Sequence, residues 1–254
     1  MCLILIAHHA HPKYPLILLA NRDEFYSRPT AQADYWSQDP EILAGKDLQA
    51  GGTWMGINKF GHIAALTNYR SLDNIQYVKS RGELVLNYIK NKNKPDAYLN
   101  QLSKLRKEYA GYNLLVGHLD HLLVFSNINN QIQQLQPGIH GLSNRFLNSD
   151  WFKVKKGKQA LAQLISEDKI ERNLFLEVLQ DRQVALDEDL PNTGFTKAQE
   201  KMLSPLFIES PTYGTRCSTI ITIDYKQAVT FFELTYQQGI QPESVEFQFQ
   251  ITAG

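Results

Sequence analysis

The chain has 254 residues with 26 basic and 26 acidic side chains, so its formal net charge is zero. This balance gives no basic field for nucleic acid or an anionic membrane, and it excludes both from the expected partners. A chain of this length buries roughly three quarters of its unfolded surface. With only two cysteines, we expect one domain over residues 1–254 without a disulfide framework, in the reducing cytoplasm.

Two short aliphatic runs open the chain, over 3–7 and 16–20. Each is followed by polar residues, which favours a pair of buried strands over helices. The first run is far shorter than the roughly 20 residues of a membrane span, so we expect neither a span nor a signal peptide. If the two strands pair, Cys2 meets the tetrad Asn-Arg-Asp-Glu at 21–24.

Cys2 is a candidate nucleophile because removal of Met1 would leave a thiol and a free α-amine on one residue. The ordinary pKa values of these groups, about 8.5 and about 7.7–8.0, both lie near neutral pH. The amine can relay the thiol proton, Arg22 can favour the thiolate, and Asp23 can orient the amine. The alternative is a buried apolar Cys2 beside a strand-end ion pair.

The next part of the chain combines a loop with a hairpin. Prolines and polar residues over 25–51 predict a loop-rich flap. Strand-like runs over 53–58 and 62–67 flank Asn-Lys-Phe-Gly, which predicts a hairpin. Gly51 and Gly52 either allow the backbone to approach a ligand closely or form a plain turn.

Two helix pairs and two groups of strands complete the chain. Apolar stripes predict helices over 80–90, 95–109, 151–165 and 173–180. Strands are expected over 112–118, 121–126, 131–135, 140–143, 217–223, 229–234 and 246–251. The segment 187–210 predicts an irregular, mobile insertion that could overhang a pocket. This order is compatible with two antiparallel sheets between helix layers.

Several motifs resemble those of the NRDE family, also called the transport and Golgi organisation protein family. They are Met-Cys at the start, Asn-Arg-Asp-Glu at 21–24, Arg-Pro at 28–29, Gly-Gly-Thr-Trp-Met-Gly at 51–56, Leu-Thr-Asn-Tyr-Arg at 66–70, Gly-Leu-Ser-Asn at 141–144 and Gly-Thr-Arg-Cys-Ser-Thr at 214–219. The resemblance covers nearly the whole chain. It implies an α+β fold of the N-terminal nucleophile hydrolase kind, a four-layer αββα sandwich of two antiparallel sheets, similar to the cysteine-type bile-salt and penicillin acylases.

The resemblance also implies a catalytic site. Its members would be Cys2, Arg22, Asp23, Asn68, Asn144 and Arg216. Asn68 and Asn144 would donate to the oxyanion of a tetrahedral intermediate, and Arg216 would be the second arginine of the site. Without the resemblance, Asn68 is better explained as a turn residue, whereas Asn144 is explained equally well as a turn or capping residue and Arg216 equally well as a strand-end cation.

Two functions from different classes follow. The first is a cysteine amidohydrolase that cleaves the C–N bond of a linear amide through a thioester. The second is a non-enzymatic trafficking or chaperone protein that carries haem or an acyl lipid in the same pocket, since the resemblance links the family to haem movement. No cofactor is required in either case, and carried haem would be non-covalent, with a histidine or the Cys2 thiolate as axial ligand, because no CxxCH motif occurs.

Other chemistries find little support in the sequence. His8, His9 and His11 resemble a metal-binding tract, but no cysteine or carboxylate lies at ligand spacing, so we expect no metal site. A P-loop, a GxGxxG after a strand and a GxSxG are absent. Nucleotide-binding and serine-hydrolase functions are therefore excluded. The substrate and the oligomeric state stay open.

Overall fold

The structure of the protein is a computed structural model that describes residues 2–72, 77, 79–91 and 94–252. Most of the predicted elements are confirmed, with ends shifted by a few residues. The strands are β1 (Cys2–His8), β2 (Leu16–Phe25), β3 (Thr30–Trp36), β4 (Asp39–Asp47), β5 (Met55–Asn58), β6 (Ile63–Asn68), β7 (Tyr112–His118), β8 (His121–Ser126), β9 (Gln131–Gln134), β10 (Gly138–Leu142), β11 (Tyr213–Ile223), β12 (Ala228–Gln237) and β13 (Ile240–Gln250). The α-helices are α1 (Gly82–Asn91), α2 (Pro95–Leu105), α3 (Phe152–Ser166), α4 (Arg172–Leu179) and α5 (Lys197–Met202).

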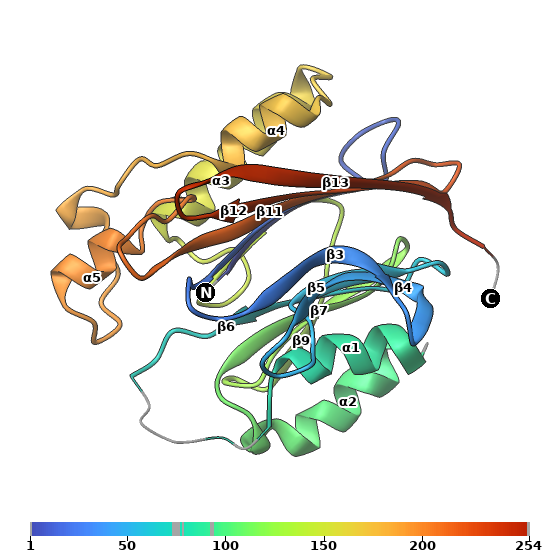
Figure 1. Ribbon diagram of the computed structural model, residues 1–254, viewed down its shortest axis with the longest axis horizontal. Coiled ribbons are helices and arrows are strands. Elements are labelled where there is room, and N and C mark those ends of the chain that lie inside the picture. Colours follow the sequence, from blue (N-terminus) through green and yellow to red (C-terminus); the bar gives the residue numbers. More distant parts are fainter. Residues whose placement is uncertain (1, 73–76, 78, 92–93, 253–254) are drawn as a thin grey trace.

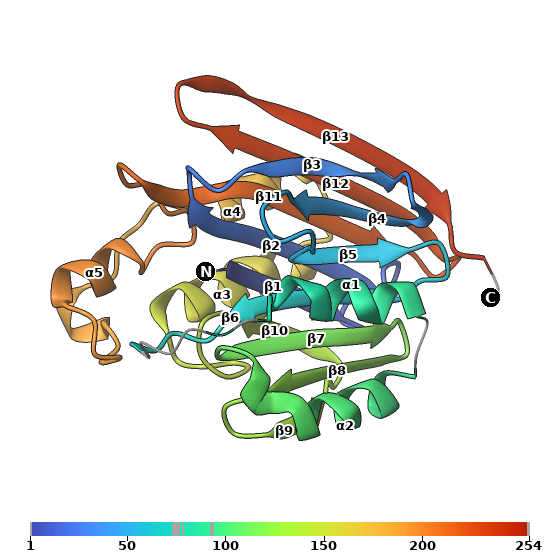
Figure 2. The same ribbon diagram turned by 60° about the horizontal axis from the view of Figure 1, so that its bottom comes forward.

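The described strands form two antiparallel sheets that pack face to face. The first sheet has the order β10-β1-β2-β11-β12-β13, and the second has the order β3-β4-β5-β6-β7-β8-β9. Helices α3 and α4 cover the outer face of the first sheet, while α1 and α2 cover that of the second (Figures 1 and 2). The predicted four-layer αββα sandwich is therefore confirmed. Within the described residues, no helix has the length and apolar character needed to cross a membrane.

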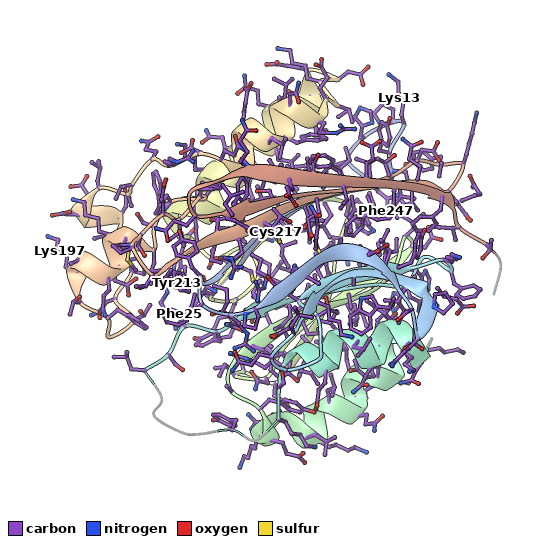
Figure 3. The ribbon with its side chains drawn as sticks, in the orientation of Figure 1. Lys13, Phe25, Lys197, Tyr213, Cys217 and Phe247 are labelled. Atoms are coloured by element: carbon purple, nitrogen blue, oxygen red, sulfur yellow. The ribbon has the colours of Figure 1, made fainter. Side chains whose placement is uncertain are left out.

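Both faces of the opening strands are buried, which explains their unbroken aliphatic sequence. In β1, Ile4 and Ile6 point into the space between the sheets, whereas Leu3 and Leu5 point toward α3 and α4. Side chains fill the space between the two sheets (Figure 3). This double burial fixes the position of β1, and therefore of Cys2 at its start.

The predicted loop over 25–51 is wrong in part, because β3 and β4 lie within it. Two features hid this hairpin from the sequence pattern. Its pairing register shifts at two places, so the apolar alternation is broken. Pro40 stands near the beginning of β4, where a strand tolerates a missing N–H.

The expected irregular insertion over 187–210 is also only partly correct. It contains a short 3-10 helix and α5, whose Thr196 forms a capping box with Gln199. The last strand begins at Ile240, well before its predicted start at Glu246. It is an edge strand of the first sheet, where Pro242 removes no required hydrogen bond.

Candidate active site

The pairing of β1 with β2 brings Cys2 to the charged tetrad, as predicted. Cys2 lies opposite Arg22 in the register of these two strands. On the other side of β2, Cys217 of β11 is also opposite Arg22. Because directly opposed residues share a face of the sheet, Cys2, Arg22 and Cys217 form one row that faces the second sheet.

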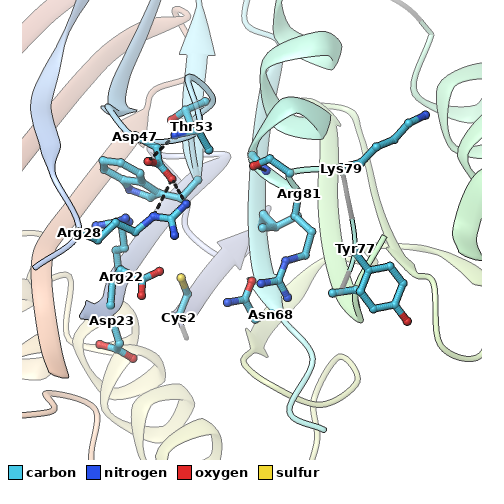
Figure 4. Close-up of a pocket in the computed structure, with 17 residues that line it drawn as sticks. Cys2, Arg22, Asp23, Arg28, Asp47, Thr53, Asn68, Tyr77, Lys79 and Arg81 are labelled. Atoms are coloured by element: carbon cyan, nitrogen blue, oxygen red, sulfur yellow. Dashed lines mark hydrogen bonds and ion pairs between the residues drawn. The ribbon is translucent and has the colours of Figure 1, made fainter. Parts of the chain in front are cut away.

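A pocket of about 370 Å³ opens at the Cys2 end of this row. Figure 4 shows the Cys2 side chain in the pocket, between Asn68 on one side and Arg22 on the other. Most of the other lining side chains are polar. The charged ones are Arg22, Asp23, Glu24, Arg28, Asp47, Lys79 and Arg81.

The thiol of Cys2 is largely enclosed, with only 9% of the residue exposed. Burial raises the pKa of Cys2, and the opposing effect of the Arg22 charge is smaller. Arg22 does lower the pKa of Cys2, as expected, but burial outweighs it, so the net pKa of the thiol is raised. A thiol in this state is protonated near neutral pH, and its use as a nucleophile requires a base beside it.

Among the described residues, Arg22 contacts an aromatic ring, and no carboxylate forms an ion pair with it. Its guanidinium carbon lies 4.2 Å from the centre of the Trp54 ring. Its Nη1 is buried and has no hydrogen-bond partner among the described residues. The simple alternative of a strand-end ion pair with Asp23 is therefore not supported, because neighbouring residues of β2 point to opposite faces of the strand.

Asp23 follows Arg22 in β2 and therefore points toward the helix-covered face. Thr215 Oγ1 donates a hydrogen bond of 2.8 Å to Asp23 Oδ1. Burial raises the pKa of the Asp23 carboxyl, and the Lys153 charge is the largest influence that lowers it. Asp23 also lines the pocket, so its carboxyl group is close to Cys2 but approaches from the side covered by helices.

The two candidate oxyanion donors occupy different depths. Asn68 ends β6 and lines the pocket. Asn144 is fully buried, is not among the described lining residues, and its Nδ2 donates to the carbonyl of Asn68 at 2.9 Å. Next to it, Ser143 Oγ donates to the carbonyl of Cys2 at 3.0 Å. Asn144 and Ser143 thus connect Asn68 to Cys2 from behind.

Arg216 is not among the described residues that line the pocket, although the resemblance placed it in the site. It occupies the bulge between Thr215 and Cys217. Its Nη1 donates to the carbonyls of Phe25 and Arg28, each at 2.9 Å. Arg216 therefore holds the loop that carries Arg28 into the pocket.

Three pocket residues were not identified from the sequence. Arg28 forms an ion pair with Asp47, with Nη2 and Oδ2 2.7 Å apart. Arg81 precedes α1, donates from Nη1 to the carbonyl of Gly111 at 3.0 Å, and interacts electrostatically with Cys2. Burial lowers the pKa of Arg81. Arg28 belongs to the Arg-Pro motif at 28–29, but no local pattern marks it, Asp47 or Arg81 as a member of the site, because their positions in the pocket depend on how separate elements pack.

Gly52 explains how α1 is brought to the pocket. A Cβ atom at Gly52 would lie 2.5 Å from the carbonyl carbon of Gly82, the first residue of α1. Gly51 has a φ of 76°, which suits glycine in a turn. Of the two roles considered for this glycine pair, the structure supports a turn with close backbone packing, and this packing positions Arg81.

The histidine tract near β1 has separate hydrogen-bond partners. His8 Nε2 lies 2.9 Å from the carbonyl oxygen of Leu119, and His11 Nε2 lies 2.9 Å from Asp168 Oδ1. In the part of the chain that the structure describes, no group of three or more His, Cys, Asp or Glu side chains could hold a metal ion.

Comparisons with known proteins agree with this architecture. The family model of Transport and Golgi organisation 2 matches residues 1–238. The human Transport and Golgi organization protein 2 homolog is 34% identical over 254 residues, which cover 92% of each chain. A conjugated bile acid hydrolase from Clostridium perfringens has a TM-score of 0.54 at 8% identity, with 100% of this chain and 98% of that chain covered.

An N-acylethanolamine-hydrolyzing acid amidase ortholog from Caenorhabditis elegans has a TM-score of 0.51 at 12% identity, over 87% of this chain and 92% of that one. At these identities the two solved structures establish a shared fold, that of the N-terminal nucleophile hydrolases, and nothing about substrates. The family match and the human relative establish the family. The chain belongs to the Transport and Golgi organisation 2 family, for which NRDE is another name.

Proposed function

We propose that this protein is an N-terminal cysteine amidohydrolase that cleaves the C–N bond of linear amides. The observation that carries the proposal is the position of Cys2: it lies at the start of β1, in a pocket that also contains Arg22, Asp23 and Asn68. The proposal requires that Met1 is removed, because only then does Cys2 carry the free α-amine.

The chemistry follows from the protonated state of the thiol. Since burial raises the pKa of Cys2, a base has to take the thiol proton, and the α-amine on the same residue is suited to this task. The sulfur attacks the amide carbonyl carbon, and the resulting oxyanion accepts a hydrogen bond from the Asn68 side chain. The proton passes to the leaving amine as the C–N bond breaks, and water then hydrolyses the Cys2 thioester to release the acid.

The lining of the pocket favours an enzyme over an apolar carrier. A carrier of an acyl lipid needs a largely apolar cavity, whereas seven of the residues that line this pocket are charged, and its apolar lining includes Trp54, Leu66 and two alanines. A carrier of haem or an acyl lipid is therefore the second candidate. It needs neither the free α-amine nor the Asn68 side chain.

Intact-mass measurement of protein from its native host tests the requirement for processing. We expect the mass to lack one methionine, with Cys2 at the N-terminus. The processed protein is then incubated with a panel of slowly reacting acyl amides, and the thioester adduct is located by peptide mapping. A fully retained Met1 would rule out the mechanism as drawn.

Cys2→Ser is the matched variant for the trapping experiment. It should abolish the thioester adduct while leaving reversible binding in the pocket largely intact. Haem and the same amides are titrated in parallel. Micromolar haem binding together with no adduct and no turnover on any amide would favour the carrier instead.

A further inference from the structure

A buried group of four charges lies behind the pocket, on the helix-covered side of the first sheet. Its members are Asp23, Arg70, Lys153 and Glu200, and each is almost fully buried. Arg70 and Glu200 form a direct ion pair, and the Arg70 guanidinium lies 4.5 Å from the centre of the Trp151 ring. The remaining two charges, Lys153 and Asp23, balance the group.

Lys153 is held in a position that nothing about folding alone favours. Only 1% of the residue is exposed, and its Nζ has no hydrogen-bond partner among the described residues. It also lies in the first turn of α3, where the helix dipole disfavours a cation. Buried unpaired charges are strongly disfavoured, so a lysine that persists here needs a compensating role.

The strongest favourable influence on the Lys153 charge comes from Asp23. Burial lowers the pKa of Lys153 to about 8, and among the opposing effects the charge of Asp23 is the largest, ahead of Cys2 and Glu200. The relation is mutual, since Lys153 is the largest influence that favours the ionised form of Asp23. The two groups thus support each other's charge, and the charge of Cys2 also influences Lys153.

We propose that Lys153 is a positioning residue whose buried ammonium group keeps Asp23 ionised, so that Asp23 holds and orients the α-amine of processed Cys2. The second half of this statement rests on the proposed function, whereas the first half concerns only Asp23 and Lys153. The interaction is through charge, because Lys153 Nζ has no hydrogen-bond partner among the described residues.

Other titratable and charged groups surround this pair and have to be considered in any pH experiment. They come from β1, β2, the segment after β6, α5 and β11, and they are Cys2, Arg22, Arg70, Glu200 and Tyr213. A test must therefore follow the titration of Asp23 itself rather than total activity alone.

The experiment follows the Asp23 carboxyl carbon by NMR in protein labelled at aspartate, with Asp23→Asn to assign the signal. In Lys153→Met, which keeps the length of the side chain but removes its charge, the Asp23 midpoint should rise by about one pH unit or more. Lys153→Arg keeps a positive charge and should return the Asp23 midpoint to near its wild-type value. Lys155→Met, on the exposed side of the same helix, is the matched control and should leave the midpoint unchanged.

A midpoint in Lys153→Met within about 0.3 of the wild-type value would overturn the proposal, since one unit is the smallest shift expected from a neighbouring charge. If Lys153→Met does not fold, Asp23→Asn provides the second test. Without the Asp23 charge the folded-state pKa of Lys153 falls below about 8, so the increase of stability with rising pH should begin at lower pH than in wild type. Superimposable stability profiles between about pH 7 and 9 would contradict the coupling.

The two proposals fail in different ways. A shifted Asp23 midpoint without amide turnover supports the role of Lys153 in charging Asp23 and removes the amidase. Amide turnover together with an unshifted Asp23 midpoint supports the amidase and contradicts the proposed role of Lys153. For the amine-holding step, Lys153→Met in an active protein should move the acid limb of the kcat/KM profile to higher pH by the same amount as the Asp23 midpoint, which a merely structural role would not do.

Discussion

The two cysteines occupy opposite ends of one row, and their surroundings differ. Both are directly opposite Arg22, Cys2 through β1 and Cys217 through β11. Cys2 borders the pocket, whereas Cys217 is enclosed between the sheets (Figure 3). The pKa of Cys217 is raised well above its ordinary value by burial and by the charge of Glu233.

The second sheet accounts for this difference. At the closed end, the carboxylate of Glu233 accepts from Ala33 N at 2.7 Å and from Thr219 Oγ1 at 3.2 Å, which joins β12 to β3. At the open end, β6 ends at Asn68, which lines the pocket, so the second sheet does not cover Cys2 there. Both residues are cysteines opposite Arg22 in the same sheet, so these features do not decide which of them can react. The groups that the opposite sheet contributes at each end decide it.

The largest expected effect is on turnover when each cysteine is replaced. Cys2→Ser should lower kcat on an amide substrate by more than about a thousandfold, because it replaces the thiol by a much less reactive hydroxyl group. Cys217→Ser replaces the thiol beside Glu233 by a hydroxyl group and should change kcat less than about twofold, since a replacement away from the reacting atoms is usually mild. Steady-state kinetics with the amide found in the trapping experiment measures both. Equal losses in the two variants would contradict the distinction between the two ends.

The second prediction compares the two asparagines at the open end. Asn68→Ala should lower kcat by roughly a hundredfold or more, with ground-state binding little changed, because an oxyanion donor acts in the transition state. Asn144→Ala should have a smaller effect, since Asn144 acts by holding the Asn68 backbone. If Asn144→Ala lowers kcat as much as Asn68→Ala at unchanged KM, Asn144 is itself an oxyanion donor.

The third prediction concerns the reactivity of the thiols. In native protein near pH 7.5, Cys2 should react with iodoacetamide at least about tenfold faster than Cys217, because Cys2 lines the pocket and its pKa is raised less. In urea the two rates should converge. Arg22→Met retains packing on Trp54 but removes a charge that favours the Cys2 thiolate, and it should slow the labelling of Cys2 a few-fold. Similar rates for both cysteines in the native state would make Cys2 a structural residue.

The sequence identified the parts of the site that depend on local order. A strand, a short link and a second strand bring Cys2 to Arg22 and Asp23, and a strand end presents Asn68, so these positions followed from periodicity, motif and resemblance. The direction of the Cys2 pKa did not follow, because it depends on burial in the complete fold. Arg81 was missed because it reaches the pocket from just before α1, a helix that docks from far along the chain, and the buried Lys153 was missed because α3 comes from still farther along the chain. Arg216 was expected in the pocket, but the bulge in β11 turns it toward the loop at 25–30.

The smallest expected effect is on the pH dependence of stability, and it comes from Glu233 at the closed end of the row. Burial raises the pKa of Glu233 above its ordinary value, so in the folded state Glu233 keeps its proton to higher pH than in the unfolded state. As pH rises from about 4.5 through the folded-state pKa, the unfolded state binds fewer protons and stability falls. Each unit of raised pKa corresponds to about 1.4 kcal/mol of this loss. Glu233→Gln cannot ionise, so its free energy of unfolding should decline less by about 1 kcal/mol or more over the same range.

Urea unfolding at several pH values between about 4.5 and 8 measures this difference for wild type, Glu233→Gln and Glu243→Gln. Glu243 is exposed on the edge strand β13, so its replacement should reproduce the wild-type slope. The comparison uses slopes rather than absolute values, because the amide introduced by Glu233→Gln would also alter the hydrogen bond with Thr219. Parallel profiles for wild type and Glu233→Gln would mean that Glu233 does not titrate abnormally, and the raised pKa of Cys217 would then have to come from burial alone.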